Sequence, residues 1–410
     1  MKYIKYSTIT IIALVGCYTL LMSVIYLIPN SLIENNVEFS VKNLVLEGDY
    51  PELLFGNSTQ FDNYTDTLML NHCISNVSGN MFQKGLSIRG YARYWHGYQV
   101  FLRPALVVFD DVQIKYINLF IFYFLLFYLV ILLNREMNWI GVFSLILPMI
   151  MCHFYVVPMS KQFFSVFLMV LLASIYILRV HRKIKSDMFP LLFFLITGSL
   201  TSFFDLLTTP VLTLGIPLSI LYFLKRDQFS NSLSRGLWFV IKNSLSWVWG
   251  YGLSWFLKWF IAGIVLGKNV IADGFQTVLF RISGECQEVQ VTFYSAIREN
   301  IYRMMYTYHV DPLSIQPSGS VKYIPLVIIL LVLIVFVVLM IGYKRKFRIE
   351  KNAVPLLLIA IYPYIWYVVL ANHSTIHAFT YRDQIVTGFA LLLFMGTFVR
   401  PKFPVFVSTP

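Results

Sequence analysis

Long apolar segments recur along the whole chain, and the links between them are short and basic. A helix that crosses the hydrocarbon core of a bilayer, about 30 Å thick, needs roughly 20 apolar residues, and about ten segments reach or approach that length. These segments are residues 7–28, 116–134, 137–157, 162–179, 188–207, 209–224, 236–265, 323–343, 353–371 and 384–399. The pattern predicts an all-α polytopic membrane protein with about ten transmembrane helices, forming one domain over residues 1–410.

Composition agrees with this class and excludes a soluble globular protein. Apolar residues make up 58% of the chain and charged residues only 13%, and the mean hydropathy is +0.69. The net charge of +12 does not indicate nucleic-acid binding, because the basic residues lie in the links between apolar segments. The first segment is too long for a signal-peptide core and has no small-residue cleavage site, so we interpret it as a membrane anchor.

The distribution of charge predicts the topology. If the amino terminus is cytoplasmic, the links on that side hold 17 Lys and Arg residues against four acidic ones, whereas the loop at 29–115 holds six basic and nine acidic residues. Positive residues concentrate on the cytoplasmic side of membrane proteins. We therefore expect a multi-pass protein of the cell membrane with both termini in the cytoplasm and an extracytoplasmic active site.

Two predicted outer loops, residues 29–115 and 266–322, are too long to be simple connectors, so we expect function to lie there. The first contains the helical stretch "TDTLMLNHCISNV", and the second contains the amphipathic pattern "EVQVTFYSAIRENIYRMMYTY". The segment "YARYWHGYQVFLRPALVVF" is rich in aromatic residues and predicts an interfacial helix along the outer leaflet. Whether Cys73 and Cys286, one in each loop, form a disulfide stays open at this point.

Asp62 and Asp66, in "FDNYTDTLMLN", are candidate catalytic carboxylates of the first loop. Their spacing of four places them on one face of a helix. Either residue can instead cap the amino terminus of that helix, and capping does not exclude catalysis.

Basic groups collect at the outer ends of several predicted spans. Taken alone, they can bind lipid headgroups. Lys258, inside "YGLSWFLKWFIAG", either extends to the interface or points inward at an anionic group. The other members of this set are Arg89, Arg93, His96, Arg103 and Lys161.

Two further segments carry polar groups at outer helix ends. Asp205, in "TSFFDLLTTPVLTLGIP", lies where an acid has to pair or reach water, and the surrounding Pro and Thr residues indicate backbone that lines a cavity. His373 and His377, in "NHSTIHAFTYRD", are four apart and precede Arg382. No third ligand or "HEXXH" motif accompanies the histidines, so a metal site is disfavoured. The histidine pair together with Arg382 favours a phosphate-binding site, because a guanidinium binds phosphate oxygens in a bidentate manner.

Together these groups predict one cavity that holds an acceptor hydroxyl and an anionic lipid donor. A carboxylate would take the hydroxyl proton, and Lys, His and Arg would stabilise the leaving phosphate.

This arrangement resembles the GT-C superfamily of polytopic glycosyltransferases, in which an acidic site follows the first transmembrane helix. The phrases that carry the likeness are "FDNYTD", "RYWHGYQVFLRP", "FFDLLTTPVLTLGIP", "GYGLSWFLKWF" and "NHSTIHAFTYR". The resemblance implies a polyprenyl-phosphate sugar as donor, with Asp62 as general base and Asp66 as the other candidate. It further implies a glycan or lipid acceptor, no divalent metal or other cofactor, and a polyprenyl-phosphate sugar synthase and a flippase in the same pathway.

The sequence departs from that family in one respect. Adjacent acids are common in the family's first loop, whereas "DD" occurs here only just before the second span. The competing acids are therefore Asp110, Asp111, Glu47 and Asp49.

Three other functions compete with a glycosyltransferase. A polysaccharide polymerase or ligase would use a lipid-diphosphate glycan and an arginine-rich late loop, but that loop has only Arg281, Arg298 and Arg303. A flippase or transporter of lipid-linked sugars would carry charges through the bilayer midplane. A membrane scaffold would need no site.

Overall fold

The computed structural model describes residues 2–53, 59–74, 78–283, 291–305 and 350–398. Within these residues the regular secondary structure is helical, apart from two isolated β-bridges, Glu52 with Gln60 and Ile88 with Tyr91. The predicted all-α class is confirmed for this part of the chain. The predicted span at 323–343, Cys286 and the carboxyl terminus lie outside the described residues.

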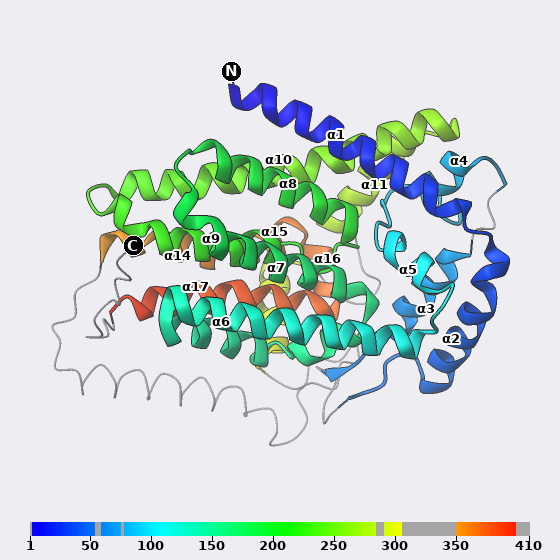
Figure 1. Cartoon of the computed structure of the whole chain (residues 1–410), viewed down its shortest axis with the longest axis horizontal. Coiled ribbons are helices and arrows are strands. Elements are labelled where there is room, and N and C mark those ends of the chain that lie inside the picture. The colour runs from blue at the N-terminus through cyan, green and yellow to red at the C-terminus, as the bar shows by residue number, and fades with distance from the viewer. Residues whose placement is uncertain (1, 54–58, 75–77, 284–290, 306–349, 399–410) are drawn as a thin grey trace.

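A bundle of helices forms the body of the molecule (Figure 1). Its helices are α1 (Lys2–Val24), α6 (Asp111–Met151), α7 (Lys161–Val180), α8 (Met188–Phe204), α9 (Leu212–Lys225), α10 (Leu233–Leu266), α14 (Pro355–Ala360), α15 (Tyr362–Val369) and α17 (Gln384–Gly396). Helix α9 is buried along almost its whole length and packs against α7, α8, α10, α14 and α17, so it is the central helix.

Short 3₁₀ segments connect many of these helices. They are η1 (Ile25–Leu27), η2 (Asn30–Leu32), η4 (Phe154–Met159), η5 (His181–Lys183), η6 (Arg226–Phe229), η8 (Lys351–Ala353) and η9 (Ala378–Asp383).

Five helical segments are long and apolar enough to cross a membrane: Lys2–Leu27, Asp111–Met151, Lys161–Lys183, Leu233–Leu266 and Lys351–Val369. Helix α8 is apolar but shorter. Helices α9 and α17, at 14 and 13 residues, extend only about 20 Å, less than the hydrocarbon core. Each predicted apolar segment within the described residues overlaps helix in the structure.

Helix α6 is a hairpin of two helices rather than one rod. Asn138 has left-handed φ and extended ψ (57° and −168°), which breaks the helix after the polar pair Arg135–Glu136. Phe122, before the break, stacks on Phe154, after the end of the helix, with ring centroids 6.2 Å apart. The chain therefore reverses at Asn138, and the sequence-predicted segments 116–134 and 137–157 are two antiparallel arms.

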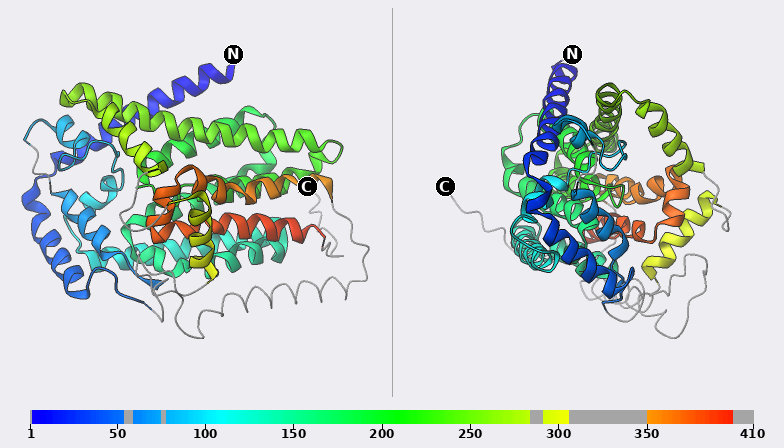
Figure 2. Two further views of the ribbon diagram at one scale, coloured as in Figure 1. Left: turned by 180° about the vertical axis from the view of Figure 1, so that it is seen from behind. Right: turned by 90° about the vertical axis from the view of Figure 1, so that its right-hand side faces the viewer.

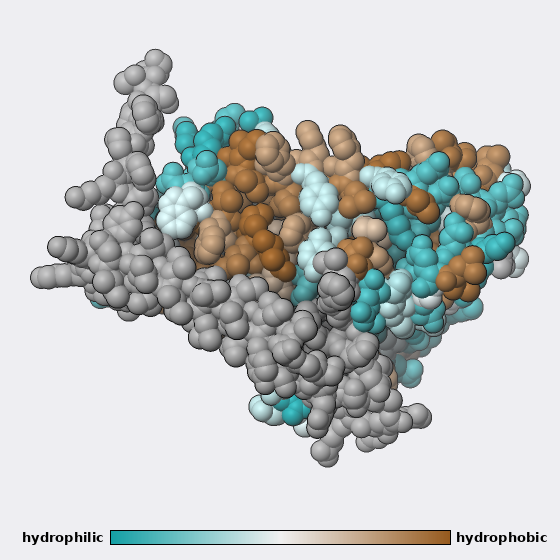
Figure 3. All heavy atoms as spheres, turned by 90° about the horizontal axis from the view of Figure 1, so that it is seen from below, coloured by the Kyte–Doolittle hydropathy of each residue, from teal (hydrophilic) through white to brown (hydrophobic). Residues whose placement is uncertain are grey.

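Large apolar side chains on the first arm of α6 face outward. Phe120, Phe124 and Phe127 are 73%, 61% and 67% exposed. Seen from below, apolar side chains cover the middle of the molecule, and polar ones gather toward its two ends, one of which holds α2 and α3 (Figure 3). Exposed apolar surface of this extent is typical of a protein that meets lipid.

Helices α8 and α10 approach more closely than most side chains allow. A Cβ atom added to Gly198 would lie 2.1 Å from the carbonyl oxygen of Trp247, and one added to Gly250 would lie 2.0 Å from that of Leu195. Ser199 and Ser254 hydrogen-bond between the same two helices at 2.7 Å. Small residues at the contact let membrane helices pack backbone to backbone.

The first predicted loop folds into a cap at one end of the bundle (Figure 2). We define the cap as α2 (Glu34–Glu47), α3 (Asn63–Cys73), α4 (Met81–Leu86) and α5 (Gln99–Ala105). The expectation that the aromatic residues before α5 rest on the membrane surface is wrong for Tyr94, Trp95 and Tyr98, which are at most 6% exposed. These rings pack inside the protein, where α10 and the cap supply more apolar contact than an interface would.

The second predicted loop contributes α11 (Val270–Ser283) and α12 (Phe293–Met305), in agreement with the predicted amphipathic pattern. Both helices pack against α16 (Ala371–Ile376), and α11 also packs against α10. This contact brings the late loop beside the histidines that follow α15.

Candidate functional site: two joined pockets beside α11

A polar pocket of about 370 Å³ lies beside α11, α16 and the segment before α5. Its lining includes two arginines, one carboxylate, two histidines and three neutral polar side chains. We call this the polar pocket; its lining residues are Tyr91, Arg93, Asp273, Gln276, Thr277, Phe280, Arg281, Asn372, His373, Ile376 and His377.

An apolar pocket of about 230 Å³ lies next to it and shares Arg93, Thr277 and Arg281. Three indole rings contribute to its wall, so the pocket offers a flat, apolar surface. Its remaining lining residues are Tyr94, Leu207, Tyr251, Gly252, Trp255, Trp259, Gly274, Val278, Trp366, Val369 and Leu370. A single ligand can therefore place a charged group beside the arginines and an apolar chain along the indoles.

Arg281 is held at the boundary of the two pockets. One terminal nitrogen of its guanidinium donates to Nδ1 of His373 at 2.6 Å, and the other donates to the hydroxyl of Tyr94 at 2.7 Å. These two bonds fix the guanidinium plane while leaving other N–H groups of its five unassigned. The residue is half-buried and therefore reachable from the pocket.

His373 and His377 are neutral at physiological pH. Burial, followed by the charges of His377 and Arg281, holds the pKa of His373 well below its usual range, and burial lowers the pKa of His377 to about 4. His373 donates from Nε2 to the carbonyl oxygen of Leu207 at 2.8 Å, which leaves Nδ1 to accept from Arg281. The cationic groups of the polar pocket are thus the two arginines, and His373 positions one of them.

The second arginine, Arg93, pairs with Asp273, the one carboxylate among the described residues that line the polar pocket. Its Nη1 atom lies 2.7 Å from Oδ1 of Asp273, and its guanidinium stacks on the ring of Tyr91. Trp259 donates its indole N–H to the backbone carbonyl of Arg93 at 3.0 Å. The pair joins the first loop to α11 across the pocket.

A strained turn supports His373. Asp205 is buried, and its Oδ1 atom accepts from the backbone N–H and the hydroxyl of Thr208. Within this turn Leu207 adopts φ +66°, a conformation unfavourable for a branched side chain. The turn aims the Leu207 carbonyl at His373 and its side chain at the apolar pocket. Asp205 therefore acts on the site through Leu207.

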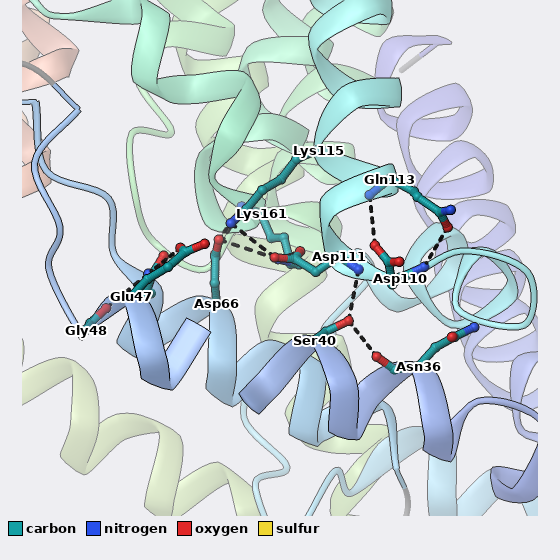
Figure 4. A network of polar contacts seen from close by, with 11 residues as sticks. Asn36, Ser40, Glu47, Gly48, Asp66, Asp110, Asp111, Gln113, Lys115 and Lys161 are labelled. Atoms are coloured by element: carbon teal, nitrogen blue, oxygen red, sulfur yellow. Dashed lines mark hydrogen bonds and ion pairs between the residues drawn. The ribbon is translucent and has the colours of Figure 1, made fainter. Parts of the chain in front are cut away.

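Asp66 lies in a buried ion cluster in the cap (Figure 4). Both its carboxylate oxygens accept from the backbone N–H of Lys161, at 3.0 and 3.2 Å, and Oδ2 lies 3.6 Å from the Lys161 ammonium. Lys161 also pairs with Asp111, which in turn lies 3.1 Å from Lys115. Burial raises the pKa of Asp66 to about 6, against the opposing charge of Lys161. The cluster ties α3 to the start of α6 and of α7.

Asp62 is the N-cap of α3, as the capping alternative predicted. Its Oδ1 atom accepts from the backbone N–H of Thr65 at 2.8 Å. Its Oδ2 atom accepts from the Thr65 hydroxyl and from the side-chain amide of Gln162, each at 2.8 Å. The carboxylate is half-buried, so it remains accessible from one side.

Among the competing acids, Asp110 caps α6 in a capping box with Gln113, and Glu47 accepts from Asn63. The backbone carbonyl of Asp49 accepts hydrogen bonds from the backbone N–H groups of Asn63 and Tyr64.

Two of the predicted phosphate-binding residues are bound to the protein itself. Arg103 donates to the carbonyls of Ile25, Ile28 and Cys73 and to the side chain of Asn30. Lys258 is fully buried and donates to the carbonyl of Leu86 at 2.7 Å, above the ring of Trp95. Both side chains hold the cap onto the bundle.

The remaining predicted cations lie outside the two pockets. His96 is buried with φ +55°, and its ring contacts those of His72, Tyr94 and Tyr98. Arg382 is buried between the rings of Phe163 and Tyr381. Of the predicted site residues, the two pockets bring together Arg93, His373 and His377, while the described residues that line them do not include Asp62, Asp66, Lys161, Lys258 or Arg382.

Sequence reasoning missed Asp273 and Asn372 and gave Arg281 only a minor place. A signal was present, because Asp273, Thr277 and Arg281 recur every four residues and so share one face of a helix. All three line the polar pocket. Asn372 had no such signal, since α16 is only six residues long.

Comparison with known proteins gives no match to a family model, to a curated protein or to a solved structure. Across the part of the chain that the structure describes, no group of three His, Cys, Asp or Glu side chains is arranged to hold a metal ion.

Proposed function

We propose that this protein is a membrane glycosyltransferase that moves a sugar from a polyprenyl-phosphate carrier to a cell-envelope glycan or lipid acceptor. The observation that carries the proposal is the shared wall of the polar and apolar pockets at Arg93 and Arg281. A polyprenyl phosphate is an anion joined to a long apolar chain. Guanidinium groups bind phosphate oxygens in a planar, bidentate manner, and indole faces bind the chain.

In this proposal Arg281 binds the phosphate, and Asp62 is the general base. The acceptor hydroxyl gives its proton to Asp62 as its oxygen bonds to the anomeric carbon. The bond from that carbon to the phosphate oxygen breaks, and the electron pair leaves on the polyprenyl phosphate, where the guanidinium stabilises it. No divalent metal is required for these steps.

Contacts connect Asp62's helix to the polar pocket. His72, near the end of α3, lies 5.4 Å from His96 between ring centroids, and His96 lies 5.9 Å from Tyr94. Tyr94 accepts from Arg281. In this proposal the acceptor lies between α3 and the polar pocket; the contacts reach the last turn of α3, and Asp62 caps its first turn. Asp66, which holds the start of α7, is assigned a positioning role.

The proposed topology places the cap and both pockets outside the cytoplasm. Basic residues gather at the opposite end of the bundle, where Arg182 pairs with Glu136 and Lys242 with Asp187. Under the positive-inside rule that end is cytoplasmic, as are both chain termini. The donor would come from a polyprenyl-phosphate sugar synthase and a flippase.

The late-loop arginines give little support to a polymerase or ligase. Arg298 pairs with Glu299, and Arg303 donates to the carbonyls of Ser374, Thr375 and His377. Of the three, only Arg281 lines the described pockets.

The test is sugar transfer by the purified full-length protein in lipid nanodiscs, with radiolabelled polyprenyl-phosphate sugars and envelope extracts as acceptors. Arg281→Gln is expected to lower turnover by roughly 10²-fold or more, as loss of a phosphate-stabilising group does. Arg298→Gln, in the same loop, is the matched control and is expected to retain activity. Absence of transfer from every donor by the folded wild-type protein would contradict the function.

A second variant tests the base. Asp62→Asn is expected to lower turnover by roughly 10²- to 10⁴-fold without weakening donor binding. Normal turnover in this variant would remove Asp62 from the mechanism and leave the function in place.

A further inference from the structure

The polar pocket offers hydrogen-bond acceptors as well as cations, and a phosphate satisfies only the cations. Arg93 and Arg281 donate, whereas the carboxylate of Asp273 and the side-chain carbonyl of Asn372 accept. A phosphate diester has no N–H or O–H group to offer these acceptors. The part of the ligand next to them therefore has to bring hydroxyl or amide hydrogens.

Asp273 has one carboxylate oxygen committed and one available. Its Oδ1 atom pairs with Arg93 at 2.7 Å, while no described residue hydrogen-bonds to Oδ2. The side chain is 51% exposed and lies at the wall of the polar pocket. Arg93 fixes the orientation of the carboxylate, so the second oxygen is presented in a defined direction.

Asn372 supplies a second acceptor from the opposite side of the pocket. Its Nδ2 atom donates to the carbonyl of Phe280 at 2.8 Å, which orients the amide. Its Oδ1 atom is buried, and within the described part of the chain it has no hydrogen-bond partner. Buried polar atoms are rarely left without a partner, so this atom indicates a ligand group that donates to it.

The rest of the wall suits a polyhydroxylated ring. Tyr91 and Phe280 contribute aromatic surface, and Gln276 and Thr277 contribute further polar groups. Repulsion from the Asp273 carboxylate keeps a phosphate on the Arg281 side, so the sugar lies toward α16 and Asp273.

We propose that Asp273 and Asn372 bind hydroxyl groups of the donor sugar and so determine which sugar the pocket accepts. This assignment rests on the proposed function, because it places the sugar of the lipid-linked donor beside the phosphate at Arg281. It gives Asp273 a role in specificity and leaves the base at Asp62.

The experiment compares two lipids of equal charge. Polyprenyl-phosphate glucose and polyprenyl methyl phosphate are both phosphate diesters, but only the first carries a sugar. Binding to the full-length protein in nanodiscs is followed by tryptophan fluorescence, to which Trp255, Trp259 and Trp366 of the apolar pocket contribute. Galactose, mannose and N-acetylglucosamine analogues extend the panel.

Wild-type protein is expected to bind at least one glycosylated lipid more tightly than the methyl phosphate. Asp273→Asn is expected to weaken binding of that lipid by roughly 10- to 100-fold, as loss of a charge-assisted hydrogen bond does, and to leave the methyl phosphate unaffected. The matched control is Asp187→Asn, because Asp187 is likewise an exposed acid in an ion pair, with Lys242, away from the pockets.

The outcomes separate the two proposals. If the wild type binds both kinds of lipid equally, or if Asp273→Asn weakens both equally or neither, the sugar subsite is overturned and the phosphate site stands. If the folded wild type binds neither kind of lipid, the proposed function falls and the subsite with it.

Discussion

Asp66 and Asp111 both contact the ammonium group of Lys161, although one acid lies in the cap and the other begins the α6 hairpin. The two acidic motifs that competed in the sequence, "DNYTD" and "DD", therefore meet at one lysine. Figure 4 shows the two acids pointing toward this lysine, and all three residues are at most 6% exposed. Buried charges of this kind are tolerated only when paired, so the three residues depend on one another.

The first prediction concerns Lys161. Lys161→Met is expected to lower the free energy of unfolding by about 3–5 kcal/mol, because it leaves the buried Asp66 without its counter-ion and Asp111 with Lys115 alone. Lys242→Met, which breaks the more exposed pair with Asp187, is the control and is expected to cost about 1 kcal/mol or less. Chemical unfolding in one detergent measures both. Equal effects would show that the buried cluster has no special role in stability.

Asp66 is expected to make stability fall as pH rises. Burial raises its pKa to about 6 in the folded protein, whereas the unfolded chain releases this proton near pH 3.9. Between these values the folded state binds more protons, so its stability relative to Asp66→Asn is highest below about pH 4. It decreases by about 3 kcal/mol as pH rises through 6.

Unfolding of wild type and Asp66→Asn at several pH values between 4 and 7 measures this difference. The prediction fails if the difference stays constant or moves in favour of the wild type as pH rises.

Gly250 is expected to be required for the contact of α8 with α10. Gly250→Ala places a methyl group against the backbone carbonyl of Leu195, which cannot move without shifting α8, so a loss of about 1–3 kcal/mol is expected. Gly252→Ala is the control, because a Cβ there meets nothing within 4 Å. Thermal unfolding compares the two variants, and an equally stable Gly250→Ala protein would contradict the close approach.

Donor binding is expected not to change with histidine protonation between pH 5.5 and 8. Burial holds the pKa of His373 well below its usual range and lowers that of His377 to about 4, so both stay neutral throughout. Fluorescence titration with a polyprenyl phosphate diester, whose own charge is constant in this range, measures the affinity. Binding that strengthens on acidification in the wild type, and not in His377→Asn, would show that His377 becomes charged.

Most of the long apolar helices could be predicted from the sequence. Hydrophobic length predicted α1, both arms of α6, α7, α8, α10 and α17. The segment "FDNYTD" indicated a helix that either Asp62 or Asp66 could cap, and the structure shows Asp62 as the cap. These features depend on residues near one another in the chain, so local patterns suffice. The burial of the aromatic segment before α5 could not be predicted from the sequence, because its contact with α10 joins segments that are distant in the chain.

The residue types predicted that the buried cations would bind oxygen atoms. They did not predict whether those oxygens would belong to a ligand or to the protein backbone. Arg103 and Lys258 have the chemistry of phosphate ligands, yet backbone carbonyls of η1 and of the cap accept from them. Arg93 and Arg281 retain access to the pockets. An arginine or lysine donates hydrogen bonds to any oxygen acceptor close enough to it. The packing of the helices determines which acceptor is close enough.

The sequence by itself predicted a membrane protein and the approximate positions of its apolar helices, because hydrophobicity and helical length are local properties. Only the tertiary structure decided that Arg281 meets His373, that Arg93 meets Asp273, and that a polar pocket opens onto an apolar one. Those pairings join segments far apart in the chain, and helix packing alone sets the distances between them.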